Sequence, residues 1–230
     1  MSETHHLIID ADDTLWENNI YFEQAFDRFV EYLAHPRLTS SQVRDSLDDI
    51  ERVNSKLHGY GSVNFGRNMV QTFGALAERT ATDADRVAIE DIAADLLSHP
   101  MVLIEGVAET LERLAGIHDL TMFTKGDPVE QRRKIDASGL AHHFDHIEIV
   151  KEKDRAAYLD LAGRRRFNHE RAWMVGNSPK SDINPALAAG LNAVYVPHAR
   201  TWVLEREEIR NEGTGRLLLL TRFAELAEHF

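Results

Sequence analysis

The stretch of residues 7–15 constrains the fold most, because a short apolar run there ends in three carboxylates within four positions. The apolar residues 7–9 predict a buried strand. Successive side chains of an extended segment point to opposite faces, so Asp10 and Asp12 share a face. Burying them is costly unless a partner such as a hard divalent cation compensates. The stretch therefore predicts a site at a strand end, the structural alternative being a solvated strand end or helix cap.

Composition limits the class of protein. A chain of 230 residues with 43% hydrophobic residues can form a core domain with a sizeable insertion. The absence of cysteine excludes disulfides, thiol catalysis and cysteine–zinc sites. A formal charge of −12 disfavours broad, non-specific binding to nucleic acid. No apolar stretch in the sequence is long enough to span a bilayer, so we expect a soluble cytoplasmic protein with no membrane partner.

Residues 17–99 show only helical periodicity and predict an all-helical insertion. The pattern predicts helices over about 18–33, 40–57, 67–79 and 83–98. The glycine-containing segment 54–67 lies between two of them and carries Lys56 and Arg67. We expect these two cations to reach a bound substrate, the alternative being that the segment is an ordinary connection between helices.

From residue 100 onward strands alternate with helices, which predicts a parallel sheet covered on both faces. Strands are expected at 120–124, 147–150, 172–175 and 193–196, and helices at 107–115, 128–138, 154–165 and 185–190. Residues 202–212 and 221–230 are expected to be helical, and 216–220 are ambiguous. The expected fold is α/β: a Rossmann-like core of residues 1–16 and 100–230, with residues 17–99 as the helical insertion.

Polar residues follow each predicted core strand. They are Thr124, Lys125 and Gly126 after the second strand, Lys151 and Lys153 after the third, and Asn177 and Asp182 after the fourth. Because the carboxyl ends of parallel strands meet at one edge, we expect these residues to gather with Asp10 and Asp12 into one site. Each has a structural alternative when taken alone, since a threonine is often a cap and a lysine pair is often a solvated charge run.

Residues 10–14 resemble the Asp-x-Asp-x-Thr signature of the haloacid dehalogenase (HAD) superfamily, most of whose members are phosphatases. Residues 176–182 resemble the Gly-Asp-(x)n-Asp loop of the same family. The order of first strand, helical insertion and remaining core resembles members that carry a helical cap. Two positions depart from the pattern: Asn177 replaces the usual acid, and Asp13 stands where glycine is frequent. The resemblance spans the chain.

The resemblance implies a role for each acidic residue. Asp10 would attack phosphorus and form an aspartyl-phosphate. Asp12 would protonate the leaving oxygen and later deprotonate the attacking water. Mg²⁺ would be held by Asp10, the backbone carbonyl of Asp12 and Asp182, with Asn177 in support.

The resemblance also implies how a phosphoryl group is bound. Thr124, Lys153 and the amides of the Lys125–Gly126 turn would hold its oxygens. Lys153 is preferred over Lys151 because the family's lysine stands just before a helix.

We therefore expect a magnesium-dependent phosphatase for a small phosphorylated metabolite, acting as a monomer or homodimer without nucleic acid. Three alternatives remain open at this stage. A phosphomutase would share every residue named. A dehalogenase would use Asp10 but would not need Asp12. A non-catalytic binding or regulatory module of the same fold is supported by Asn177 alone.

Overall fold

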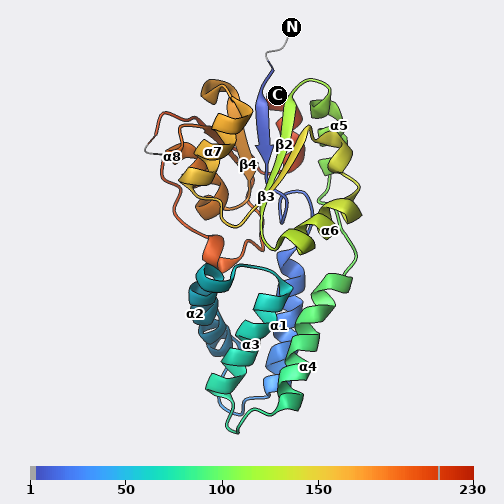
Figure 1. Ribbon diagram of the computed structural model, residues 1–230, viewed down its shortest axis with the longest axis vertical. Coiled ribbons are helices and arrows are strands. Elements are labelled where there is room, and N and C mark those ends of the chain that lie inside the picture. The colour runs from blue at the N-terminus through green and yellow to red at the C-terminus, as the bar shows by residue number, and fades with distance from the viewer. Residues whose placement is uncertain (1–3, 212) are drawn as a thin grey trace. The chain divides into compact units, whose positions relative to one another are not determined.

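The computed structural model describes residues 4–211 and 213–230 (Figure 1). The chain forms two compact units. The α/β unit comprises the described residues up to Glu17 together with Met101–Phe230, and the helical unit comprises Asn18–Pro100. The boundaries expected from the sequence, after residues 16 and 99, each lie one residue before the boundaries of the structure, which fall after Glu17 and Pro100.

The α/β unit is built on a six-stranded sheet with the order β3-β2-β1-β4-β5-β6, and all neighbouring pairs among the described strands are parallel. The strands are β1 His6–Ile9, β2 Asp119–Lys125, β3 His146–Val150, β4 Ala172–Gly176, β5 Asn192–Tyr195 and β6 Leu217–Leu219. The α/β prediction is confirmed. Because β1 is flanked by β2 and β4, the residues that follow it lie at the middle of the sheet's carboxyl edge.

Both faces of the sheet are buried, and side chains alternate between them. In β1, Leu7 and Ile9 belong to one apolar cluster, while Ile8 between them belongs to another. Helices α5 (Val107–Ala115), α6 (Pro128–Ser138) and α9 (Leu226–His229) cover the first face, and α7 (Arg155–Arg165) and α8 (Asn184–Ala188) cover the second (Figure 1). The continuous apolar run of β1 therefore reflects burial on both sides.

The predicted starts of α6 and α7 are confirmed. The Asp127 carboxylate accepts hydrogen bonds from the amides of Val129 and Glu130 at 2.9 and 3.0 Å, with Pro128 in the first helical position. Asp154 caps α7 in the same way, accepting from the Ala157 amide at 2.8 Å. These caps fix where α6 and α7 begin relative to the strand ends beside them.

The C-terminal predictions are partly wrong. Residues 202–211 hold one short 3-10 turn, Val203–Glu205, instead of a helix, and residue 212 lies outside the described residues. The ambiguous segment forms β6, and 221–230 forms the 3-10 turn Phe223–Glu225 followed by α9. Side chains elsewhere bind the backbone carbonyls of 202–211: Lys180 donates to Leu204 at 2.9 Å and Asn184 donates to Glu208 at 2.9 Å. These tertiary contacts replace helical hydrogen bonds.

The helical unit consists of α1 (Asn19–Leu33), α2 (Ser40–His58), α3 (Ser62–Leu76) and α4 (Asp83–Ala94), followed by the 3-10 turn Asp95–Ser98. Aromatic and aliphatic side chains of all four helices form its core. The predicted 54–67 connection is wrong, because α2 and α3 leave only residues 59–61 between them. Gly59 and Gly61 make this tight turn with φ of 81° and 108°. Across the described ranges, no helix has the length and apolar character needed to cross a membrane.

The central strand provides a test of this core. Ile8 is fully buried between two neighbouring strands. Ile8→Ala should lower the free energy of unfolding by about 2–5 kcal/mol, and Ile8→Val by about 0.5–1.5 kcal/mol. Urea denaturation measures both values. Val129→Ala, at a side chain that is 78% exposed, should leave the midpoint nearly unchanged; an equal loss at Val129 would contradict the burial assigned to Ile8.

Candidate active site

The chain leaves β1 through a turn fixed by its own backbone. The Asp10 amide donates to the Val175 carbonyl at 2.9 Å, which extends the pairing with β4 by one residue. The Leu15 amide donates to Ala11 at 2.8 Å and the Asp13 amide to Trp16 at 2.8 Å. Asp13 has a φ of 60°, in the left-handed region where glycine is favoured and aspartate is tolerated. This backbone conformation accounts for the Asp13 departure noted in the sequence.

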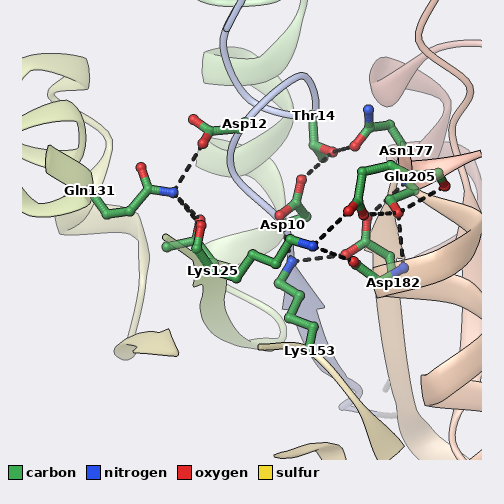
Figure 2. A network of polar contacts seen from close by, with 12 residues as sticks. Asp10, Asp12, Thr14, Lys125, Gln131, Lys153, Asn177, Asp182 and Glu205 are labelled. Carbon is green, nitrogen blue, oxygen red and sulfur yellow. Dashed lines mark hydrogen bonds and ion pairs between the residues drawn. The ribbon is translucent and has the colours of Figure 1, made fainter. Parts of the chain in front are cut away.

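Lys153 lies between two carboxylates at the centre of the site (Figure 2). Its ammonium nitrogen is 2.5 Å from Asp10 Oδ1 and 2.8 Å from Asp182 Oδ1, and all three side chains are buried. Burial alone would lower the pKa of Lys153, but Asp10 and Asp182 outweigh it and raise that pKa. Lys151, the other lysine after β3, is exposed. The structure therefore places Lys153 against the first aspartate.

Asp182 belongs to the loop that follows β4. The Ser178 amide donates to Asp182 Oδ2 at 2.9 Å, and the turn Pro179–Ile183 is π-helical. Gly176 makes this geometry possible, because a Cβ at that position would overlap the Asp182 carboxylate. Burial, reinforced by the charge of Asp10, raises the pKa of Asp182 to about 7 despite the nearby Lys153. The pair of carboxylates carries more negative charge than one lysine neutralises.

Asn177 faces the same site through Thr14. The Thr14 hydroxyl lies 2.9 Å from Asp10 Oδ2, to which it donates, and 3.3 Å from Asn177 Oδ1. The Asn177 amide nitrogen donates to Thr201 Oγ1 at 3.0 Å. The amide oxygen of Asn177 is thereby turned towards the Asp10 side of the loop. Thr201 was not anticipated from the sequence.

Asp12 contacts Gln131 of α6 (Figure 2). Gln131 in turn connects Asp12 to Thr124. Gln131 Nε2 is 3.0 Å from Asp12 Oδ2 and 2.8 Å from Thr124 Oγ1. Lys134 Nζ is within 2.7 Å of both Asp12 oxygens, and Trp16 Nε1 donates to Oδ1 at 2.8 Å. The sequence analysis missed Gln131 and Lys134, although their spacing on a predicted helix places them on one face.

The turn after β2 differs from the expected phosphate cradle. The Gly126 amide donates to the Val150 carbonyl at 3.1 Å, so it is engaged within the structure and the predicted role of this amide is wrong. The Lys125 ammonium is 2.7 Å from Glu205 Oε1 and 2.8 Å from Ser181 Oγ. Thr124 is buried at the end of β2, and its predicted role as a phosphate ligand stays a prediction.

Glu205 is a further residue of the site that was not anticipated from the sequence. Its carboxylate contacts Lys125 and accepts from Ser178 Oγ at 2.6 Å, which ties the 3-10 turn Val203–Glu205 to the loop after β4. Burial would raise the pKa of Glu205, but Lys125 and the hydrogen bonds to Ser178 and Ser181 lower it overall. Glu205 lies in a segment that was expected to be helical, and no local sequence pattern indicated this role.

Lys56 and Arg67 lie in the helical unit. Lys56 is exposed on α2, and Arg67 is exposed on α3, where it donates to Asn64 Oδ1 at 3.0 Å. Contact between these two side chains and a substrate bound at the α/β unit stays a prediction.

The donor set fits a hard divalent cation. Asp10 and Asp182 offer buried carboxylate oxygens, Asn177 offers a neutral amide oxygen, and burial together with the charge of Asp10 raises the pKa of Asp182. Within the described ranges, one set of three His or acidic ligand atoms lies within 4.8 Å of one another, and it is formed by Asp13, Glu17 and His198. Its carboxylates approach opposite ring nitrogens of His198, at 3.8 and 3.4 Å, so the imidazole lies between the two acidic side chains.

The comparisons place this geometry in a family. The haloacid dehalogenase-like hydrolase family matches residues 4–190, so the chain belongs to that family of hydrolases. It is similar to the structure of a haloacid dehalogenase-like family hydrolase from Xanthomonas campestris, with 28% identity, a TM-score of 0.82, and 98% of this chain and 94% of that chain covered.

Two further matches are more distant or partial. L-2-haloacid dehalogenase from Xanthobacter autotrophicus has the same fold at 15% identity, with a TM-score of 0.66 and 98% of each chain covered. A phosphoserine phosphatase from Thermus thermophilus is 34% identical over 82 residues. That alignment covers 34% of this chain and 33% of the relative, so it spans about a third of the relative's length.

The raised pKa of Asp182 predicts how stability depends on pH without metal. An unfolded aspartate releases its proton near 3.8, whereas folded Asp182 keeps it to about 7. Because the native state binds more protons in this window, the free energy of unfolding should fall as the pH rises through it. The free energy of unfolding of Asp182→Asn should fall less steeply with pH than that of wild type, as measured by urea unfolding in the presence of a chelator. Asp160→Asn, at an exposed carboxyl, should keep the wild-type slope; equal slopes for wild type and Asp182→Asn would contradict the assignment.

Proposed function

We propose that this hydrolase is a magnesium-dependent phosphatase that acts on a small phosphorylated metabolite through an aspartyl-phosphate on Asp10. The proposal rests on a second carboxylate, Asp12, which follows Asp10 on the same turn. Lys153 binds Asp10, and Gln131 joins Asp12 to the hydroxyl of Thr124. This set provides a nucleophile, an acid–base group and a phosphate ligand. The partial match to a phosphoserine phosphatase is consistent with phosphate-ester chemistry.

In the proposed mechanism, Asp10 attacks phosphorus along the line of the leaving oxygen. The hydrogen bonds from Thr14 and Lys153 orient the Asp10 carboxylate for this attack. Asp12 gives a proton to the leaving oxygen, and in the second step takes one from the water that cleaves the aspartyl-phosphate. Lys153 and Thr124 lie where they can bind phosphoryl oxygens, whose negative charge the transition state spreads.

Mg²⁺ would be held by Asp10, the Asp12 carbonyl and Asp182, with Asn177 in support. When bound it supplies charge that screens the anionic substrate from the anionic nucleophile. The helical unit would act as a cap that excludes water and selects the substrate, and Lys56 and Arg67 are its proposed substrate ligands. The partners proposed are a small metabolite and no nucleic acid or membrane, for a monomer or homodimer.

Dehalogenase activity is the second candidate, because a haloacid dehalogenase shares the fold. Displacement of halide needs no proton donor, so a dehalogenase would have no use for the four hydrogen-bond contacts that hold the Asp12 carboxylate. A phosphomutase would use every residue named for the phosphatase, and product analysis separates the two.

The proposed roles of the two aspartates can be separated with an aryl phosphate. Its phenol is a good leaving group that needs no proton, so Asp12→Asn should release one burst of phenol and then stall as aspartyl-phosphate. Asp10→Asn should form no adduct, because it lacks the nucleophile. Rapid mixing followed by intact-protein and peptide mass measurement detects the adduct and its position.

The wild-type protein is the control. It should hydrolyse the aryl phosphate continuously with magnesium and lose this activity with a chelator. A burst from Asp10→Asn, or an adduct that maps to Asp12, would reverse the two roles. Release of halide from a 2-haloacid, with no phosphate released from any ester, would make the chain a dehalogenase.

The metal assignment makes a further prediction. Asp182→Ala removes a charged ligand, whereas Asn177→Ala removes a neutral group that water can replace. The magnesium concentration for half-maximal activity should rise about 100-fold or more for Asp182→Ala and about tenfold or less for Asn177→Ala. A magnesium titration of phosphate release measures both, and equal shifts would contradict the roles given to the two residues.

A further inference from the structure

We propose that Lys134 is a positioning residue that holds the carboxylate of Asp12 in place for proton transfer. The inference rests on the proposed function, in which Asp12 is the acid–base group. Lys134 belongs to α6, more than a hundred residues further along the chain than Asp12, and the sequence motifs of the site do not include it.

The contacts around Asp12 carry the inference. Asp12 Oδ1 is 2.8 Å from Trp16 Nε1 and 2.7 Å from Lys134 Nζ, while Oδ2 is 3.0 Å from Gln131 Nε2 and 2.6 Å from Lys134 Nζ. Lys134 is thus the one donor among these three that touches both oxygens. Trp16 and Gln131 each hold one oxygen, and Lys134 fixes the rotation of the whole carboxylate group.

The position of α6 explains why Lys134 can do this. Asp127 caps the helix immediately after β2, so its first turns lie beside the strand end that carries Thr124. Gln131 and Lys134 are three positions apart and lie on one face of the helix. Gly126 has a φ of 150° and leaves the space that the Gln131 side chain occupies. Thr124 and Asp12 are therefore positioned by neighbouring side chains of a single helix.

Burial distinguishes Lys134 from Lys153. The side chains of Lys134 and Asp12 are 27% and 24% exposed, whereas that of Lys153 is 1% exposed. An ion pair that solvent still reaches contributes little to stability. Its effect on proton transfer can be much larger, because a small displacement of an acid–base group costs up to about 100-fold in rate. The interaction is therefore better suited to holding a reactive group than to stabilising the fold.

A double-mutant cycle tests the proposal. Lys134→Met keeps most of the side-chain stem but loses the ammonium group. We expect it to slow the breakdown of the aspartyl-phosphate, and with it kcat, by about 10- to 100-fold, with kcat/KM for an aryl phosphate changed less than about twofold. In the Asp12→Asn background, where breakdown is already slow, Lys134→Met should slow it no further.

The same measurement contains its controls. Arg133→Met makes the same type of change at an exposed neighbour on α6 and should leave breakdown at the wild-type rate. A loss from Lys134→Met that is equal in both backgrounds, or no loss at all, would overturn the positioning role while leaving the phosphatase intact. If wild type forms no aspartyl-phosphate from any ester, the proposed function fails and the role of Lys134 fails with it.

Discussion

The site depends on one buried ammonium group placed between two buried carboxylates. Lys153 comes from the segment after β3, Asp10 follows β1 and Asp182 follows β4, so their contacts join three loops at the sheet's carboxyl edge. Removing one partner from a buried ion pair typically costs about 3–5 kcal/mol, because the remaining charge is left without compensation. With two carboxylates and one lysine, an excess negative charge remains, and burial together with the charge of Asp10 raises the pKa of Asp182. The same excess is what makes the pair suitable for a divalent cation.

The two aspartates of the β1 turn are held by different means, which suit the two proposed tasks. Asp10 is buried and is fixed by Thr14 and Lys153, as a nucleophile that must approach phosphorus in one direction requires. Asp12 lies at the partly exposed rim and is held by Lys134, Gln131 and Trp16. A group that exchanges protons with a leaving alcohol and then with water needs this access to solvent.

The sequence was sufficient to predict β1 and the start of α6, where a local pattern determines the structure. The apolar run before Asp10 and the cap at Asp127 predicted β1 and the start of α6, because burial on both faces and a side-chain cap are encoded by adjacent residues. Glu205 could not be predicted, since its position depends on Lys125 and Ser178 from distant segments. The start of α3 was predicted too late. The glycine-containing composition of this segment indicated a long loop, whereas Gly59 and Gly61 form a short turn at residues 59–61. Long-range partners, which have no local pattern, account for most of the missed site residues.

Asn177 was the main argument for a non-catalytic module, and its contacts weaken that argument. Its amide nitrogen donates to Thr201 Oγ1 at 3.0 Å, a bond that an aspartate could not donate, and the Thr201 hydroxyl lies 3.0 Å from the His198 carbonyl, to which it can donate in turn. The asparagine is therefore matched by its surroundings, as a residue with a defined function in this loop would be. Its oxygen still faces Thr14, beside Asp10. Having an amide in place of the usual acid removes one negative charge from a site where the charges of Asp10 and Asp182 already exceed that of Lys153, so the change moderates the electrostatic cost of the site and keeps a side-chain oxygen beside Asp10.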